Sequence, residues 1–198
     1  MDPFALLTDG AFPRSTLPAH LFGFTPGVLS WEAFNLSKRK SAVAFLFLPP
    51  APGSLVARIV LTRRSKTVRT HKGQIGFAGG RAEAGDISPA DTALREMREE
   101  IGLDPAKVTV HGFLQPQVAL DQSLIIPVVA TAAVSEAMLA PAPTEVADIY
   151  YCEWDTLTPA AGLRFGFTIF GVRRQSWIFG DPAVWGLTAE ILACAEMR

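Results

Sequence analysis

The sequence predicts an α+β fold, an α/β/α sandwich in which a mixed sheet lies between helices. The expected elements run in the order strands, one central helix, more strands and a last helix, which is typical of this class. Hydrophobic residues make up 49% of the chain and charged residues only 19%, as in a packed globule rather than a disordered chain. The length of 198 residues predicts one domain over 1–198, with residues 1–40 as an N-terminal extension packed on it.

The expected strands are short apolar runs bounded by turn residues. The first, Ser41–Leu48, ends at the Pro- and Gly-rich segment 49–53 and should form a hairpin with Leu55–Arg63. A short run, Gly73–Ala78, should be broken by the glycine pair that follows it. The remaining elements expected along the chain are strands over Val108–Leu114, Leu124–Ala133 and Ile149–Trp154, a hairpin within Gly166–Phe179, and a helix over Leu187–Met197.

The best-defined element is a helix over Pro89–Ile101. Ser88 is suited to the N-cap, Pro89 to the first helical position, and Asp91 to the position that completes a capping box. Gly102 follows the last turn, where glycine commonly ends a helix. The apolar residues that should face the core at helical spacing are Ala90, Ala93, Leu94, Met97 and Ile101.

Composition argues against several classes of protein. The net charge of −1 gives no whole-molecule reason to expect a nucleic acid or a membrane as partner. The apolar runs are too short to span a bilayer, and the first residues do not lead into a signal peptide. Cys152 and Cys194 have no metal-like spacing and are too few for a disulfide framework. We therefore expect a cytoplasmic protein without nucleic-acid or membrane partners. The sequence does not indicate its oligomeric state.

The charges are nevertheless segregated along the chain. From Ala33 to Ala82 there is no Asp or Glu, but there are ten Lys or Arg residues. From Glu83 to Asp104 the balance reverses, with seven acids against Arg95 and Arg98. Such a pattern suits a polyanionic substrate held against a bound cation, although ordinary surface charge is the alternative.

Three acids share one face of the central helix. Glu96, Glu99 and Glu100 stand at i, i+3 and i+4, where like charges repel each other. By helical periodicity, Arg95 and Arg98 point elsewhere and do not relieve this repulsion. A hard divalent cation would relieve it, because Mg²⁺ takes oxygen ligands and often bridges substrate phosphates. The alternative is a solvated acidic face.

Residues 80–103 form a loop–helix–loop with a recognisable pattern, Gly-x5-Asp-x8-Arg-Glu-Met-x-Glu-Glu-x-Gly-Leu. The pattern resembles the Nudix box, the signature of the Nudix hydrolase family. Asp86 stands where the family usually has Glu, and one extra residue precedes Arg95. The resemblance implies the Nudix fold and a hydrolase of nucleoside diphosphates linked to another moiety, with Mg²⁺ or Mn²⁺ as cofactor.

The same resemblance implies roles for residues of the helix. Arg95 would be structural and would pair with an acid of the loop. The implied metal ligands are Glu96, Glu99 and Glu100.

A second motif lies directly upstream. It comprises Leu61-Thr62-Arg63-Arg64-Ser65, then Arg69, Gly73 and Phe77-Ala78-Gly79-Gly80. It resembles the additional signature of the coenzyme A pyrophosphatase branch of Nudix hydrolases, with Val60 in place of a Leu and Ala78 in place of a Pro. Enzymes of that branch split coenzyme A into 3′,5′-ADP and 4′-phosphopantetheine.

Coenzyme A carries a diphosphate and a separate 3′-phosphate, so it needs cationic groups besides the metal. Arg is suited to bidentate phosphate contacts and Lys to a point charge. Glycines in the motif would permit tight turns and close approach to substrate. The candidate substrate-binding residues are Arg63, Arg64, Lys66, Arg69, Lys72, Gly79 and Gly80.

The expected reaction is metal-assisted attack of water on phosphorus, which requires a general base. Glu99 or Glu100 on the helix is one candidate. Glu145, which precedes a strand returning toward the core, is the other. Glu145 as an ordinary loop acid is the alternative reading.

Two rival functions remain at this level. The chain could be a Nudix hydrolase for other nucleotides, such as dinucleoside polyphosphates or nucleotide sugars. It could also be a Nudix-fold binding module without chemistry, although such a module is expected to have lost a metal carboxylate and none is lost here.

Overall fold

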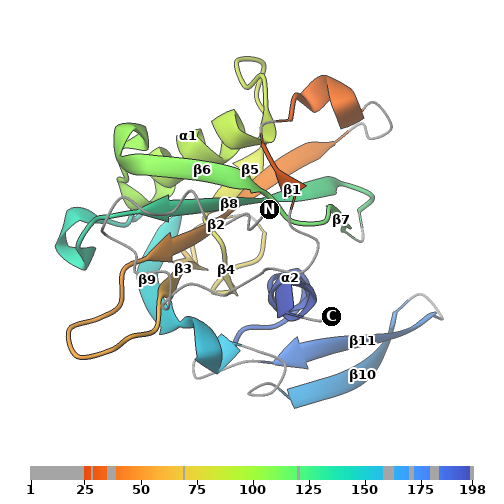
Figure 1. The fold of residues 1–198 in the computed structure, drawn as a ribbon. Coiled ribbons are helices and arrows are strands. Elements are labelled where there is room, and N and C mark those ends of the chain that lie inside the picture. Colours follow the sequence, from red (N-terminus) through yellow and green to blue (C-terminus); the bar gives the residue numbers. More distant parts are fainter. Residues whose placement is uncertain are drawn as a thin grey trace.

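The computed structural model describes residues 25–27, 29–34, 39–68, 70–119, 121–157, 163–169, 172–178 and 183–196. Within these residues, one mixed sheet of nine strands lies between helices α1 and α2 (Figure 1). The predicted α/β/α arrangement is therefore confirmed. No described helix is long and apolar enough to cross a membrane.

The elements follow in chain order. They are β1 (Thr25–Pro26), the 3-10 helix η1 (Trp31–Phe34), β2 (Lys40–Leu48), β3 (Arg58–Arg64), β4 (Ile75–Gly76), β5 (Gly79–Arg81), α1 (Pro89–Ile101), η2 (Pro105–Lys107), β6 (Val108–Phe113), β7 (Gln117–Val118), β8 (Leu124–Ala132), η3 (Glu136–Met138), β9 (Val146–Glu153), η4 (Trp154–Leu157), β10 (Leu163–Ile169), β11 (Val172–Ile178) and α2 (Leu187–Glu196).

The strand β2 organises the sheet. One edge of β2 pairs in parallel with β8 over eight residues, Lys40 to Phe47. Its other edge pairs first with β5, over Ser41–Val43, and then with β3, at Phe47 and Leu48. The hairpin strands β2 and β3 thus diverge from their turn, and β4 and β5 lie between them, paired with β3 and β2 respectively. This intervening segment leads directly into the loop before α1.

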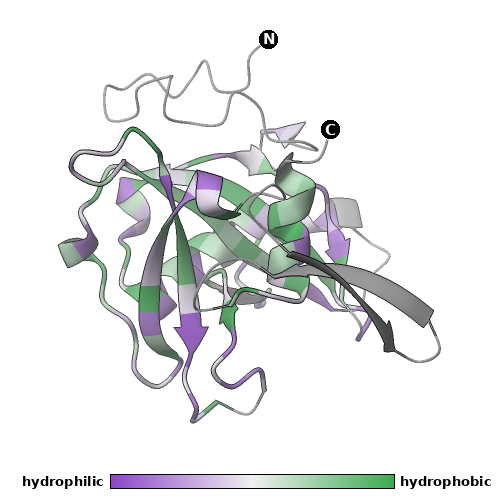
Figure 2. Cartoon of the chain, turned by 90° about the horizontal axis from the view of Figure 1, so that it is seen from below, coloured by the Kyte–Doolittle hydropathy of each residue, from purple (hydrophilic) through white to green (hydrophobic). Residues whose placement is uncertain are grey.

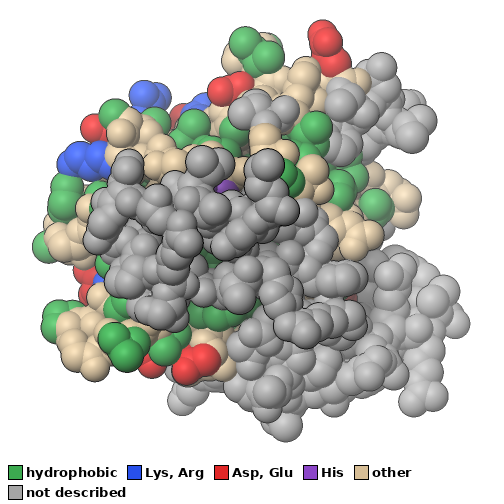
Figure 3. Space-filling model, in the orientation of Figure 1, with side chains coloured by type: hydrophobic (Ala, Val, Ile, Leu, Met, Phe, Trp, Pro, Cys, Tyr) green, Lys and Arg blue, Asp and Glu red, His purple; other side chains and the backbone are tan. Residues whose placement is uncertain are grey.

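Each face of the sheet carries its own core. Met97 and Ile101 of α1 pack against even-numbered residues of β2 such as Leu46. Odd-numbered residues such as Phe45 face the other way, toward α2 and Trp154. The hydropathy colouring in Figure 2 shows apolar residues along the inner strands and α2, with hydrophilic residues at the strand ends. On the face seen in Figure 3, the described hydrophobic side chains lie in small groups among polar and charged ones.

The central helix has the predicted bounds and caps. Ser88 Oγ accepts from the Asp91 amide at 3.1 Å, and Asp91 Oδ2 accepts from the Ser88 amide at 2.8 Å, which completes the capping box. Gly102 ends the helix with a φ of 68°, a left-handed conformation that glycine adopts without strain. These local interactions hold α1 in register against the sheet.

Some strand predictions were wrong in their bounds. The hairpin partner of β2 begins at Arg58, not Leu55, because the turn continues and leaves Leu55 exposed. Gly79 and Gly80 do not break a strand, since they form β5 against β2. The strand predicted over Ile149–Trp154 begins at Val146 and ends before Trp154.

The other elements agree more closely with the sequence. The hairpin predicted within Gly166–Phe179 forms from β10 and β11 as a separate two-stranded sheet, although β10 begins earlier, at Leu163, and α2 follows as predicted. Of the N-terminal extension, β1 pairs with β6 and η1 packs beside the loop before α1. The predicted residues Phe179 and Met197 lie outside the described residues.

Candidate active site

The site is built on two buried carboxylates of α1. The side chains of Glu96 and Glu100 are buried on the face of the helix next to β5, whereas Glu99 is exposed. Glu100 Oε2 accepts a hydrogen bond from the backbone N–H of Gly79 at 3.1 Å. Since Gly79 is held by strand pairing with Val43, the sheet itself positions the Glu100 carboxylate.

The glycine pair of β5 makes room for these carboxylates. A Cβ at Gly79 would lie 2.7 Å from the Cα of Val43, so a side chain there would separate β5 from β2. A Cβ at Gly80 would lie 2.7 Å from Cδ of Glu96 and nearer still to its Oε1. The close approach predicted for these glycines therefore exists, but to the protein's own carboxylates. Their contact with a substrate stays a prediction.

The prediction that Arg95 points away from the acidic face was wrong. Its Nη1 donates to Glu96 Oε1 and to Glu99 Oε2, both at 2.9 Å. The opposite edge of the guanidinium donates to Asp86 Oδ2 at 3.1 Å and to the carbonyl of Arg81 at 2.8 Å. Periodicity failed here because a long, flexible side chain curls along the helix surface to reach neighbours at i+1 and i+4.

Asp86 takes the role of loop acid despite its shorter side chain. It accepts from Arg95, from the backbone N–H of Glu83 at 2.9 Å and from the hydroxyl of Thr92 at 2.9 Å. Burial would raise the pKa of Asp86, but these donors outweigh it and hold the pKa below its usual value. Asp86 is therefore ionised at neutral pH and anchors the guanidinium.

Arg64 is the second cation beside the buried carboxylates. Its Nη1 lies 3.5 Å from Glu100 Oε1, a long and weak contact. Its Nε is buried and has no hydrogen-bond partner. The rest of the side chain is 31% exposed and its one ion pair is long, so its other N–H groups are suited to receive an anion from outside the protein.

Glu145 approaches the cluster from a different element. It lies in the loop before β9, where its carbonyl accepts from the amide of Ser65 at 2.7 Å, and its side chain is exposed. Its charge adds to the repulsion felt by Glu96 and Glu100. The fold thus brings Glu145 close enough to Glu96 and Glu100 for their charges to interact. Both candidates for the general base, on α1 and in the loop before β9, are therefore near the same site.

The electrostatics of the two buried acids favour a bound cation. Burial raises the pKa of Glu100 to about 7, against the hydrogen bond from Gly79, and the charge of Glu96 adds to the increase. Burial likewise raises the pKa of Glu96, although Arg95 opposes the change. In both groups the cost of burying the charged form outweighs the hydrogen bonds and charges that oppose it.

Among the described residues, no three His, Cys, Asp or Glu side chains converge as closely as bound metal ligands do. In this structure the guanidinium of Arg95 bridges Glu96 and Glu99. The donor set nevertheless fits a hard divalent cation, because it consists of carboxylate oxygens and includes two whose charge is poorly compensated. Glu96, Glu99 and Glu100 as its ligands stay a prediction.

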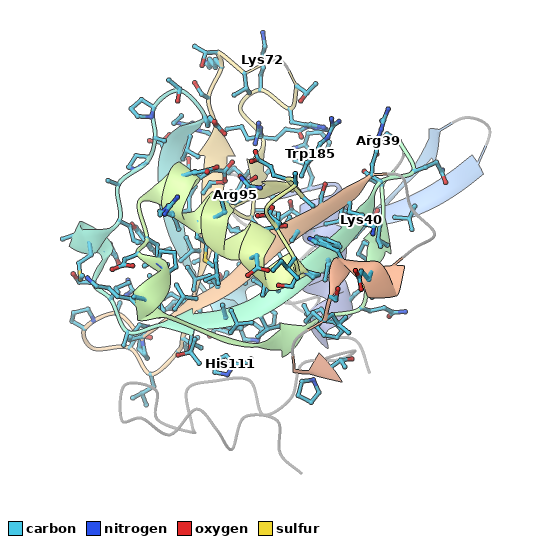
Figure 4. The ribbon with its side chains drawn as sticks, turned by 90° about the horizontal axis from the view of Figure 1, so that it is seen from above. Arg39, Lys40, Lys72, Arg95, His111 and Trp185 are labelled. Carbon is cyan, nitrogen blue, oxygen red and sulfur yellow. The ribbon has the colours of Figure 1, made fainter. Side chains whose placement is uncertain are left out.

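The other predicted substrate-binding residues occupy different positions. Arg63 pairs with Asp148 of β9, its neighbour in the strand register, on the face of the sheet opposite Arg64. Lys66 and Lys72 are exposed in the β3–β4 loop, and Figure 4 shows Lys72 at its outer end, extending away from α1. Arg69 lies outside the described residues. Of these cations, Arg64 contacts the buried carboxylates directly.

Sequence reasoning missed Thr92, which is fully buried and donates to Asp86. A signal existed, since Thr92 stands four residues before Glu96 and therefore on the same helical row. A polar residue there, between the apolar residues Ala90 and Ala93 of the core-facing stripe and Glu96, indicates a buried hydrogen bond.

Comparison with known proteins assigns the family. The NUDIX domain model matches residues 38–167, well over half of the chain. Nudix hydrolase 22, chloroplastic, of Arabidopsis thaliana is 35% identical over 78% of this chain, which spans only 53% of that relative. Mitochondrial coenzyme A diphosphatase NUDT8 of Mus musculus is 31% identical over 83% of this chain and 80% of its own length.

A solved structure shows the same fold. The Nudix hydrolase RenU of M. smegmatis superposes with a TM-score of 0.50 at 20% identity, over 61% of this chain and 73% of that one. The chain belongs to the Nudix hydrolase family, and a diphosphatase is the class of enzyme that this assignment supports. Members of the family generally use divalent metals such as Mg²⁺ or Mn²⁺. The relatives' names place them in different compartments, so a cytoplasmic location stays a prediction.

The steric role of Gly80 predicts a specific loss on substitution. Gly80→Ala should displace the Glu96 carboxylate and weaken Mn²⁺ binding by about tenfold or more, as measured by titration calorimetry. Gly85→Ala is the matched control, because a Cβ there meets no atom within 4 Å. Equal Mn²⁺ affinity in the two folded variants would show that the position of the Glu96 carboxylate does not depend on the glycine at position 80.

The raised pKa of Glu100 predicts a pH-dependent stability. In the metal-free protein Glu100 holds its proton up to about pH 7, whereas in the unfolded chain its pKa is the ordinary 4.5. The folded state binds more protons in this window, so its stability should fall as pH rises from 4.5 to about 7. Glu100→Gln keeps an acceptor for the Gly79 amide but carries no charge, and should remove this decrease.

We expect metal-free Glu100→Gln to be more stable than wild type at pH 8 by up to about 3 kcal/mol, since a change of one in pKa corresponds to about 1.4 kcal/mol. The gain should disappear below pH 4.5. Urea denaturation in a chelating buffer measures it, with Glu99→Gln as the exposed control. A similar gain in both variants would show that burial of Glu100 is not its cause.

Proposed function

We propose that this protein hydrolyses the diphosphate bond of coenzyme A, or of a coenzyme A derivative, in a reaction that depends on Mg²⁺ or Mn²⁺. The products would be 3′,5′-ADP and 4′-phosphopantetheine. The observation that carries the proposal is the pair of buried carboxylates beside Arg64, a cation with an unpartnered N–H. A cation held by this acidic pair, next to a partly exposed guanidinium that makes only one long contact, would suit a substrate phosphate that bridges the two.

The choice of substrate rests on two further observations. The segment 60–80 resembles the coenzyme A signature, and the chain is 31% identical to a relative named as a coenzyme A diphosphatase. Arg64 occupies an arginine position of that signature and is also the cation nearest to the carboxylates. Sequence motif and geometry thus support the same substrate class.

In the mechanism that we propose, Glu96, Glu99 and Glu100 would hold the metal. When bound, the metal would neutralise charge on the diphosphate oxygens and acidify a water molecule. Water forms a new P–O bond, the bridging P–O bond breaks, and the leaving phosphate takes the bonding electrons. The water's proton passes to a carboxylate of the chain.

The chain offers two positions for that general base. Glu99 or Glu100 would act from the helix, and Glu145 would act from the loop before β9. Glu145 is exposed and belongs to a separate element, so as the base it would act on the water molecule from outside α1. Arg64 would hold the diphosphate against the site, because an arginine offers several N–H groups in a rigid, planar arrangement.

Substrate specificity is the first test of the proposal. With Mg²⁺ or Mn²⁺, the purified protein should convert coenzyme A to 3′,5′-ADP and 4′-phosphopantetheine, as separated by chromatography, and should not do so without metal. Glu100→Gln should abolish turnover, which excludes both a contaminating enzyme and a binding module without chemistry. If ADP-ribose, NADH, a nucleotide sugar or a diadenosine polyphosphate has a higher kcat/KM than coenzyme A, that compound and not coenzyme A is the preferred substrate.

The roles of the two neighbouring arginines separate in the same assay. Arg64→Ala should lower kcat/KM by about tenfold to a hundredfold, because a charge-assisted contact to phosphate contributes about 1.5–3 kcal/mol. Arg63→Ala is the matched control, since Arg63 pairs with Asp148 on the other face of the sheet. A larger loss from Arg63→Ala than from Arg64→Ala would contradict this assignment.

A further inference from the structure

A chain of hydrogen bonds, which is buried at Trp31 and Thr92, joins the N-terminal extension to the carboxylates. The indole N–H of Trp31 donates to Thr92 Oγ1 at 3.2 Å, and the Thr92 hydroxyl donates to Asp86 Oδ2 at 2.9 Å. Asp86 holds the guanidinium of Arg95, whose other edge donates to Glu96 and to Glu99. We call the first four residues, Trp31, Thr92, Asp86 and Arg95, the relay.

Three of the four relay side chains, those of Trp31, Thr92 and Asp86, are well shielded from water, and Arg95 is partly exposed. Thr92 is fully buried, Trp31 is 6% exposed, and the side chain of Asp86 is 7% exposed. Hydrogen bonds in such surroundings are costly to break, because a buried polar group that loses its partner is not rehydrated. The relay therefore restricts the orientation of each side chain along it.

The position of Trp31 is itself fixed by contacts at both of its ends. Its backbone N–H donates to the carbonyl of Ile87 at 3.0 Å, and its carbonyl accepts from Nζ of Lys40 at 2.7 Å. The 3-10 helix η1 thus lies against the loop that enters α1 (Figure 1). Trp31 precedes residue 38, where the match to the NUDIX domain begins, so this contact comes from outside the family domain.

We propose that Trp31 is a positioning residue for the metal-binding carboxylates, acting through Thr92, Asp86 and Arg95. Asp86 is shorter than the glutamate usual at its position, and Thr92 holds it toward the guanidinium. Because a guanidinium is planar and rigid, the direction in which Asp86 holds one edge sets where the other edge meets Glu96 and Glu99. The inference rests on the proposed metal-dependent function, which it extends to the N-terminal extension.

Loss of the relay would weaken metal binding by either of two routes. An Asp86 carboxylate that is free to rotate no longer aligns Arg95 with the acids of α1. A guanidinium released by Asp86 also competes with the metal for Glu96 and Glu99. Both routes act on metal affinity before any substrate is present.

The test is Mn²⁺ affinity, measured by titration calorimetry on the full chain without substrate. Thr92→Val removes the hydroxyl at nearly constant shape and should weaken binding by about tenfold, as is usual for groups that orient metal ligands. Trp31→Phe should weaken it in the same direction. The double variant should bind no more weakly than Thr92→Val alone, because both substitutions break one chain. Thr92→Ser should restore the wild-type affinity.

A matched control separates positioning from general stability. Trp154 is also a buried tryptophan, but it packs on Phe45 and Phe47 at the opposite face of the sheet. Trp154→Phe should lower the melting temperature and leave Mn²⁺ affinity unchanged. Equal losses of affinity from Trp154→Phe and Trp31→Phe, or independent effects of Trp31→Phe and Thr92→Val, would overturn the inference.

The same measurements distinguish failure of the inference from failure of the proposed function. If the wild type binds Mn²⁺ and Trp31→Phe binds it equally well, the inference alone fails. If the wild type binds no Mn²⁺, the metal-dependent function fails and the inference fails with it. If the variants lose affinity but coenzyme A is not hydrolysed, the relay stands and only the substrate changes.

Discussion

Burial of two like-charged carboxylates against the glycine pair of β5 is the constraint on which the site depends. Glu96 and Glu100 are largely removed from water, and the backbone N–H of Gly79 donates a hydrogen bond to Glu100. Desolvation raises the pKa of both groups, and repulsion from neighbouring carboxylates adds to the increase. The fold, held by its large apolar cores on either face of the sheet, thereby maintains an acidic site that favours the approach of positive charge.

Arg95 and Arg64 respond to that acidic site in different ways. Arg95 is fully engaged, with Asp86 and a backbone carbonyl at one edge and two glutamates at the other, so it acts as an internal counter-charge. Arg64 makes one long contact and keeps a buried N–H without a partner. One arginine therefore stabilises the arrangement of the acids, and the other is available to an incoming anion. Arginine serves in both roles because the two side chains differ in exposure and in how many of their N–H groups already have acceptors.

Much of the site could be predicted because its signals are local. The capping box at Ser88 and the glycine at 102 determine the ends of α1, and the spacing of its acids then follows from helical geometry. The direction of Arg95 could not be predicted in this way, since a long side chain is not confined to the face given by its Cα. Strand alternation places the neighbours Arg63 and Arg64 on opposite faces, but it could not show which of them pairs with Asp148 of β9 and which with Glu100 of α1.

The sequence by itself determined the class of fold, the central helix with its caps, the acidic residues on that helix and the resemblance to a family of metal-dependent hydrolases. Tertiary structure alone decided that Gly79 and Gly80 form a strand under those acids, and that Trp31 reaches Thr92 across 61 positions of the chain. The physical reason is the distance along the chain between the residues that interact. Caps and helical faces depend on residues a few positions apart, whereas strand pairing and buried hydrogen bonds between distant segments depend on how the whole chain packs.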